Sequence, residues 1–377
     1  MNTFTHWWRT VGVLIGLELR QRTRATRWRV LLGVFFVVVS LVIFGSLWFA
    51  TSLSEDGYRD WAANLYFIVL GFVGFLGLVI APTMTATSIN GDRKDATLAV
   101  VQATPASGLQ VATGKLLGGW IASCALLLVS APYLIWGVIE ANYPLWTALL
   151  GIASVGLLFL TYCGIGLGYS ALTSRPIGSA ALTQLTTLFL LIGLPIINAL
   201  LMPATQSRVA ADRPVWTYSD GGLSGTCRIE RSTITVEHPE RIWWILAPNP
   251  AVILADAAAQ SDAGRAAEQR RYADYTDAHG NQLPRPSESA LGALADSVSR
   301  LRTPPELNQD RTCSEVGYFA GRDTFYLRED RRTDGYLGHT WYWGLLANLA
   351  LGGVGLAFAA RRLRVPAGRL PRGVRIA

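Results

Sequence analysis

The sequence predicts an all-α membrane protein of six transmembrane helices, with an N-terminal amphipathic surface helix and a mixed α/β extracytoplasmic insert between helices five and six. The first observation is composition: 51% of the 377 residues are hydrophobic and the mean hydropathy is +0.30, too apolar for an ordinary soluble domain. The second is that the apolar residues gather in blocks long enough to cross a bilayer, which takes about 20 residues. The third is that clusters of basic residues alternate with these blocks.

The net charge of +7 is unevenly distributed along the chain. Residues 203–340 hold 16 Lys and Arg against 19 Asp and Glu, a net charge of −3, so the rest of the chain carries +10. This excess flanks the apolar blocks, which is the positive-inside pattern of membrane proteins and not the basic stripe of a nucleic-acid-binding protein. We therefore expect a multi-pass protein of the plasma membrane that contacts lipid and binds no nucleic acid.

Residues 1–29 are expected to form an amphipathic helix on the cytoplasmic surface. Apolar side chains recur there at helical spacing, and five arginines crowd residues 20–29. Glu18 lies seven residues after Val11, on the apolar face of this helix, where a carboxylate needs a partner. Arg22, four residues later, is the simpler partner. A basic residue of a docked cytoplasmic protein is the alternative.

Residues 30–202 are predicted to hold five transmembrane helices, and residues 341–360 the sixth. Both termini, including the basic tail 361–377, then lie in the cytoplasm, and residues 203–340 lie outside. The predicted spans are Val30–Phe49, Trp61–Ile80, Leu116–Ile139, Leu145–Leu172, Ile177–Met202 and Trp341–Ala360.

A few residues within the predicted spans are candidates for transport or packing. Asn64, Gln184 and Asn198 are polar, and each either lines a pathway or hydrogen-bonds between helices. Gly164 and Gly168 form a small-xxx-small pair that permits close approach of helices. We favour packing inside the subunit over a subunit interface for this pair.

Residues 203–340 are predicted to form the extracytoplasmic domain. The alternating run Arg228–Val236 indicates a strand, and Ala257–Tyr275 and Ser289–Leu301 indicate helices. Arg241–Leu254 is apolar but too short to span and is broken by prolines, so we expect it to rest on the outer leaflet. The domain is a candidate lid, or a docking site for an envelope partner.

Two cysteines of this domain, Cys227 and Cys313, are predicted to form a disulfide. An oxidising exterior permits the bond, which stabilises the fold by roughly 4–5 kcal/mol in the chain-entropy model. Two free thiols are the alternative. The chain has no Cys-x-x-Cys pair, so a zinc ribbon is not expected.

No motif in the sequence indicates catalysis, a metal site or a bound cofactor, so we do not expect an enzyme. Gly108–Lys115 resembles a phosphate loop, but five residues separate its glycines where four are needed, and Leu116 replaces the magnesium-binding Ser or Thr. We expect Lys115 instead to snorkel at the inner end of the third span. The histidines are scattered, which argues against a metal site or a catalytic triad: His6, His238, His279 and His339.

The longest polar interruption in the first half of the chain is residues 89–105. Its apolar part covers barely two helical turns, too short to cross a bilayer. An element of this kind lies beside a membrane or docks into a partner. The alternation of basic clusters places it on the cytoplasmic side, where a partner protein can reach it.

The order of these features resembles the permease subunits of type-2 ABC exporters, with an actinobacterial-like C-terminal tail. That family has an acidic-Arg pair followed by Gly-Thr-Leu, then Thr-Pro, then Gly-Lys. The stretch departs from that pattern at two positions: the acid is Asp where Glu is usual, and Ala96 stands where Gly is usual. The matching residues are Asp92-Arg93, Thr97-Leu98, Thr104-Pro105 and Gly114-Lys115.

The resemblance implies that residues 89–105 form a coupling helix seated in a separate cytoplasmic ABC ATPase. Two ATPase copies would carry ATP and Mg²⁺, and a second permease copy or a homologous permease would complete the transporter. The substrate would be a drug, lipid or peptide-like amphiphile. An ion- or metal-extruding permease is one alternative, and a membrane scaffold or sensor acting through residues 203–340 is another. The implied docking residues are Glu18, Gly91, Asp92, Arg93, Asp95, Thr97, Leu98 and Val101.

Overall fold

The computed structural model describes residues 3–53, 57–94, 105–141, 143–218, 225–258, 290–305 and 335–363. These residues are mostly helical, with one two-stranded sheet. Within them, six helical segments are long and apolar enough to cross a membrane, as the sequence predicts. Each contains one predicted span, and they cover Thr26–Leu53, Gly57–Lys94, Gly108–Glu140, Leu145–Leu172, Pro176–Thr205 and Trp341–Arg362.

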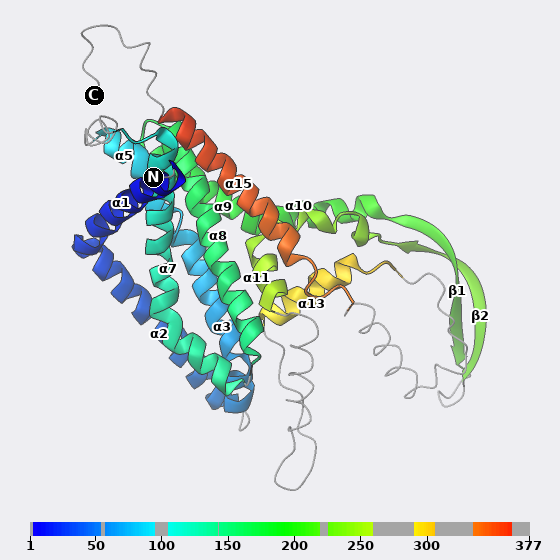
Figure 1. Cartoon of the computed structure of the whole chain (residues 1–377). Coiled ribbons are helices and arrows are strands. Elements are labelled where there is room, and N and C mark those ends of the chain that lie inside the picture. The colour runs from blue at the N-terminus through cyan, green and yellow to red at the C-terminus, as the bar shows by residue number, and fades with distance from the viewer. Residues whose placement is uncertain are drawn as a thin grey trace.

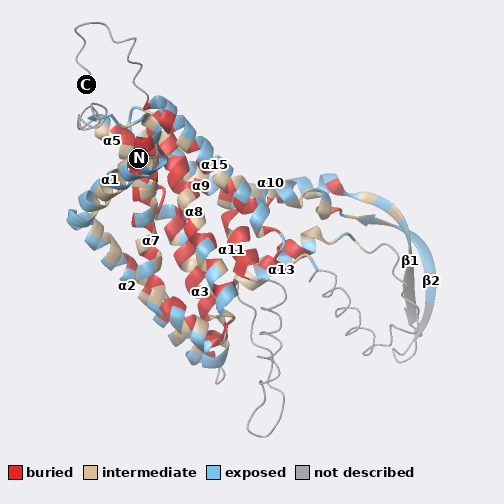
Figure 2. Cartoon of the chain, in the orientation of Figure 1, coloured by how far each residue is buried: buried red, intermediate tan, exposed pale blue. Residues whose placement is uncertain are grey.

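Helix α1 (Thr3–Arg24) lies across one end of the bundle, and α2 (Thr26–Leu53) runs from there along its side (Figure 1). Residues 3–24 are helical as predicted, and Val11 of the predicted apolar face is fully buried, whereas Phe4 and Trp8 of the same face are 69% and 45% exposed. Figure 2 shows that α1 and α2 are largely exposed, whereas α3, α7 and α8 hold most of the buried residues.

Helices α3 (Gly57–Ile80), α4 (Thr83–Ala86) and α5 (Ser88–Lys94) follow one another with short breaks. The first break falls at Pro82, which lacks the backbone N–H that a continuous helix requires. The second apolar segment therefore continues into the start of the polar stretch 89–105. Residues 95–104 of that stretch lie outside the described residues.

Helices α7 (Gly108–Glu140) and α8 (Leu145–Leu172) form the centre of the bundle together with α3, and α15 (Trp341–Arg362) packs against α8. Gly164 and Gly168 of α8 lie against α15, where a Cβ added to Gly168 would come 2.7 Å from the Cα of Gly355. The preference for packing inside the subunit is confirmed, because bare backbones let these two helices approach closely.

The fifth apolar segment consists of α9 (Pro176–Leu188), a π-helical turn η1 (Phe189–Gly193), α10 (Leu194–Leu201) and η2 (Met202–Thr205). The π-helical turn comes just before Pro195, a residue type that often distorts a helix. The three polar residues predicted within spans all hydrogen-bond inside the protein. Gln184 donates to Val79 of α3, Asn198 to Ile242, and Asn64 to Asp60 of its own helix.

The insert contains an antiparallel hairpin, β1 (Ser207–Tyr218) and β2 (Gly225–Val236), which extends away from the bundle beyond α10 (Figure 1). The strand predicted at Arg228–Val236 is confirmed as part of β2. Strand β1 has no counterpart in the prediction. Helix α13 (Ala290–Arg302) confirms the helix predicted over Ser289–Leu301. Most of Ala257–Tyr275 lies outside the described residues.

The expectation that Arg241–Leu254 rests on a membrane surface is wrong for its second half. After two short turns, η3 (Pro239–Arg241) and η4 (Trp243–Ile245), helix α11 (Pro250–Ala258) packs against α3, α8, α13 and α15. Asn249 caps α11 by accepting from the backbone of Ala251 at 2.9 Å, and Ile253 is fully buried. A short apolar helix whose backbone is capped can enter a bundle and pack on protein instead of lipid.

The predicted disulfide falls outside what the structure describes. Cys313 lies outside the described residues, and only the backbone of Cys227, in β2, is described. The Cys227–Cys313 bond therefore stays a prediction. Cys124 and Cys163 within the bundle are free thiols.

Candidate functional site

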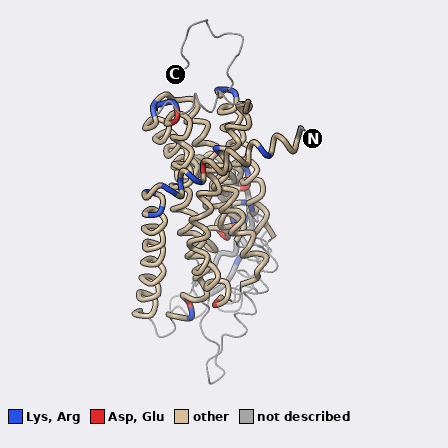
Figure 3. The backbone as a smooth tube through the Cα atoms, turned by 60° about the vertical axis from the view of Figure 1, so that its left-hand side comes forward, with Lys and Arg blue, Asp and Glu red and all other residues tan. Residues whose placement is uncertain are grey.

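The end of the bundle that carries α1 and α5 is strongly basic (Figure 3). The opposite ends of α3 and α7 carry Arg59 together with Asp60 and Glu140. The apolar segments therefore separate a basic end from a mixed one. The exposed basic residues at the α1 end are Arg9, Arg20, Arg24, Arg27, Arg29, Arg93, Lys94, Arg175, Arg361 and Arg362.

Helix α1 is seated on two glycines of α7. A Cβ on Gly114 would lie 2.6 Å from the Cβ of Leu14, and one on Gly118 would lie 2.8 Å from the Cβ of Glu18. A real Cβ atom does not approach other atoms so closely. Glycine at these two positions of α7 therefore allows α1 to pack this close to α7. The glycine pair brings the Glu18 carboxylate next to Lys115, one residue along from Gly114.

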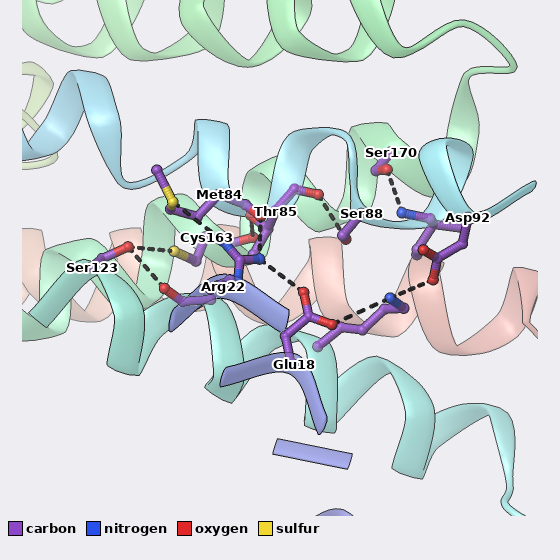
Figure 4. Close-up of polar contacts among 12 residues, drawn as sticks. Glu18, Arg22, Met84, Thr85, Ser88, Asp92, Ser123, Cys163 and Ser170 are labelled. Atoms are coloured by element: carbon purple, nitrogen blue, oxygen red, sulfur yellow. Dashed lines mark hydrogen bonds and ion pairs between the residues drawn. The ribbon is translucent and has the colours of Figure 1, made fainter. Parts of the chain in front are cut away.

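Four charged side chains meet at this contact (Figure 4). The Lys115 ammonium lies 2.6 Å from Asp92 Oδ2 and 3.6 Å from Glu18 Oε2, and Arg22 Nη2 donates to Glu18 Oε1 at 2.8 Å. Three of the side chains are 11–18% exposed and Asp92 is 31% exposed. We call Glu18, Arg22, Lys115 and Asp92 the charge network. It links α1, α7 and α5.

Arg22 also ties α1 to α4. Its Nη2 donates to the Met84 carbonyl at 2.7 Å, and its Nη1 lies 3.2 Å from the Met84 sulfur. A guanidinium presents several donors in a fixed planar array, so one side chain can bind the carboxylate of its own helix and the backbone of another. Helix α1 thus holds both short helices that follow α3: α4 through Arg22, and α5 through Lys115 and Asp92.

Helices α4 and α5 are fixed on their other side by α8 and α9. Thr85 donates to the Cys163 carbonyl at 2.6 Å, and the Ser170 hydroxyl accepts from the backbone N–H of Ile89 at 3.0 Å. Asn90 Nδ2 donates to the Ser179 hydroxyl at 2.7 Å. The first turns of the polar stretch are therefore anchored within the bundle.

The charge network keeps Glu18 ionised despite its burial. Burial alone raises the pKa of this carboxyl, but the positive charges of Lys115 and Arg22, with their hydrogen bonds, outweigh it and bring the pKa below its ordinary value of 4.5. The network thus contains two carboxylates and two cations, so the buried charges balance one another.

The predicted docking residues fall into three groups: those paired within the bundle, those that are exposed or have open space beside them, and those outside the described residues. Glu18 has the simpler predicted partner, Arg22, and a second one in Lys115. Asp92 pairs with Lys115, whereas Arg93 is exposed. Gly91 has open space around its Cα. Four of the predicted docking residues lie outside the described residues: Asp95, Thr97, Leu98 and Val101.

The expectation that Lys115 snorkels toward water is wrong. Lys115 is 9% exposed and its ammonium is paired with two carboxylates. It belongs to the first two turns of α7, which begins at a capping box formed by Ser107 and Gln110, so Gly108–Lys115 is helical and not a phosphate loop. Sequence reasoning recognised that Glu18 needed a partner but could not find one 97 positions away, because the contact depends on how α1 crosses α7.

Sequence reasoning also missed a contact in the insert. His238 lies between the side chains of Ser207 and Glu240, each within hydrogen-bond distance of one ring nitrogen. Among the residues that the structure describes, no group of three or more His, Cys, Asp or Glu side chains is placed to hold a metal ion.

Comparison with known proteins assigns the chain to no family. No protein-family model matches it, and no curated protein matches it in sequence. The fold, the charge network and the sequence pattern are therefore the basis for a functional proposal.

Proposed function

We propose that this chain is the permease subunit of an ATP-driven ABC exporter and moves an amphiphile, such as a drug, lipid or peptide-like molecule, across the plasma membrane. The observation that carries the proposal is the pairing of Lys115 with both Asp92 and Glu18. It ties the start of the polar stretch 89–105 to α1 and α7. The resemblance of that stretch to the coupling segment of type-2 exporters supports the same function.

The orientation is proposed from charge. Short basic segments beside membrane helices favour the cytoplasm, and the basic residues gather at the α1 end (Figure 3). In this orientation α1, α5 and both termini are cytoplasmic, and the insert 203–340 is extracytoplasmic. The exposed outer face of α1 then lies against lipid headgroups, with Trp8 and Val13 among its exposed apolar residues.

In the proposed mechanism, ATP hydrolysis by separate subunits supplies the energy. Two cytoplasmic ATPase copies bind ATP and Mg²⁺, and a second permease copy or a homologous permease completes the pathway. The exposed Arg93 and the residues that follow it contact the ATPase. A force on α5 passes to α7 through the Asp92–Lys115 pair and to α1 through Glu18. Because α3 runs into α4 and α5 with only short breaks, the second span moves with them.

The experiment that tests the proposal is a search for an ABC ATPase gene beside the gene of this chain, followed by co-purification of the full chain with that ATPase. Arg93→Glu and Leu98→Asp are expected to reduce recovery of the ATPase and its stimulated hydrolysis by about tenfold or more, a loss of at least roughly 1.4 kcal/mol of binding. Arg175→Glu is the matched control, since it makes the same charge change at an exposed site outside the stretch. Wild-type recovery in all three variants, or the lack of a neighbouring ATPase, contradicts the proposal.

A further inference from the structure

Three polar side chains at the base of the hairpin are aligned in the order of a serine hydrolase triad. Ser207 Oγ lies 2.7 Å from His238 Nε2, and His238 Nδ1 lies 2.8 Å from Glu240 Oε1. A carboxylate only accepts hydrogen bonds, so Nδ1 carries the imidazole proton and donates to Glu240. Nε2 is then left to accept from the Ser207 hydroxyl. This is the orientation in which histidine acts as a general base toward serine.

The hairpin register places these residues together. Ser207 opposes Val236 at the open end of the sheet, and His238 comes two residues after Val236. The backbone N–H of His238 donates to the Thr205 hydroxyl at 3.2 Å, which fixes the backbone that carries the ring. Pro239 then begins the short turn η3, which brings Glu240 back to the imidazole.

Burial differs among the three side chains in a way that suits catalysis. His238 is 8% exposed, so the residue as a whole is largely shielded from water, whereas Ser207 is partly exposed and can meet a substrate. The second carboxylate oxygen of Glu240 is buried and has no hydrogen-bond partner among the described residues. Glu240 meets the imidazole through its other oxygen, Oε1, so the carboxylate lies where it can stabilise a positively charged ring.

A purely structural role does not require this arrangement. The base of the hairpin is already closed by the strand pairing, by the Thr205 contact, and by Gln206, which donates to Glu237 at 3.1 Å. None of these contacts requires a histidine that lies between a serine hydroxyl and a carboxylate.

We propose that Ser207, His238 and Glu240 form a catalytic triad that hydrolyses an acyl ester. Ser207 Oγ forms a bond to the ester carbonyl carbon while His238 Nε2 takes the hydroxyl proton. The carbon–oxygen bond of the ester breaks, and the leaving alcohol receives that proton from His238. Water, deprotonated by His238, then attacks the acyl-Ser207 carbonyl, releasing a carboxylic acid and restoring the serine. Glu240 holds the ring and stabilises its charged form.

The surroundings favour an ester on an amphiphile. The site follows η2, which continues from α10, and the last residues of α10, Leu200 and Leu201, are exposed. The exposed Trp244 follows η3 in the chain. The apolar segment Pro176–Thr205 is long enough to cross a membrane and ends two residues before Ser207, so the proposal places the site at a lipid surface. A substrate with an apolar acyl chain can rest there beside Ser207. This activity stands apart from transport and does not depend on an ATPase.

The test uses the purified full chain in detergent, a fluorophosphonate probe and mass mapping of the modified residue, together with turnover of a p-nitrophenyl acyl ester. The wild-type adduct is expected on Ser207. Ser207→Ala and His238→Gln are expected to lower ester turnover by about 100-fold or more, and Glu240→Gln by a similar or smaller factor. Ser232→Ala, at an exposed serine of β2, is the matched control and should leave turnover unchanged.

The adduct position in the wild-type protein decides the question even if a variant fails to fold. Modification of Ser207 at no more than the rate of Ser232 overturns the proposal. Ester turnover that survives Ser207→Ala or His238→Gln in a folded protein overturns it as well. Either result leaves the transport proposal untouched, because co-purification with an ATPase involves the other end of the bundle.

Discussion

The ammonium of Lys115 lies 2.6 Å from the carboxylate of Asp92, and this contact joins the third apolar helix to the short helix that follows the second. Lys115 also lies 3.6 Å from Glu18 of α1, so its side chain connects α1, α5 and α7. A buried ion pair is weak support for stability, but separating its partners leaves an uncompensated buried charge and is strongly unfavourable. We therefore regard the charge network as a device that makes α1, α5 and α7 move together.

Removing Lys115 should destabilise the protein. Lys115→Met leaves Asp92 and the buried Glu18 short of a counter-charge, which is expected to cost about 3 kcal/mol. Thermal unfolding of the purified protein measures the loss. Lys94→Met is the matched control, because Lys94 is exposed and should matter little. Equal melting temperatures for the two variants contradict the assigned role of Lys115.

The seating of α1 on α7 can be tested at glycine positions. Gly118→Leu places a side chain where Glu18 packs and is expected to cost about 1–3 kcal/mol and to loosen α1. Gly12→Leu lies on α1 itself with open space around it and should be tolerated. Protease cleavage within residues 1–24 reports the loosening. Similar cleavage rates for both variants would show that α1 does not depend on the glycine contact.

The lowered pKa of Glu18 predicts how stability depends on pH. A carboxyl whose folded-state pKa is lowered contributes stability that is present above its unfolded value, here 4.5, and is lost as pH falls through the folded value. The wild-type protein should therefore lose melting temperature more steeply than Glu18→Gln as the pH falls below 4.5. Parallel curves for the two proteins would mean that Glu18 gains nothing from its partners.

Asp256 should order the chain that enters the last span. Its two carboxylate oxygens accept from the backbone N–H groups of Gly338 at 2.7 Å, Thr340 at 2.6 Å and Trp341 at 2.8 Å. Asp256→Asn replaces one accepting oxygen with a donor and should cost about 2 kcal/mol. Hydrogen exchange at these amides is expected to speed up. Asp296→Asn, which breaks an ion pair with 57% exposed Arg300, is the control and should leave them unchanged.

The sequence was sufficient to predict the features that depend on local composition. All six apolar segments follow from block length and hydropathy, and the burial of one face of α1 follows from helical spacing. The Glu18–Arg22 pair also follows, because its members are four residues apart on one helix. Helix α13 and strand β2 were predicted from the periodicity of their apolar residues.

Features that depend on contacts distant in sequence were missed. Lys115 was expected at the water boundary, because nothing near it in the sequence shows that Asp92 and Glu18 lie beside it. Strand β1 was missed because Asp212 and Pro214 interrupt its alternation, although pairing with β2 holds it extended. The contact of His238 with Ser207 was missed as well, because the two residues are 31 positions apart in the sequence. The hairpin register that brings Ser207 to it cannot be predicted when only one strand is recognised.

The measurement that tests the central claim most directly is ATPase stimulation by the Asp92→Asn chain in a reconstituted complex. This change breaks the link between α5 and Lys115 while leaving Glu18 in place, and it spares the exposed Arg93. We predict that the ATPase still binds, but that stimulation of its hydrolysis by the permease falls about tenfold, a coupling free energy near 1.4 kcal/mol. Wild-type stimulation by Asp92→Asn would contradict the account, and so would loss of ATPase binding, which would place Asp92 in the docking surface instead of the charge network.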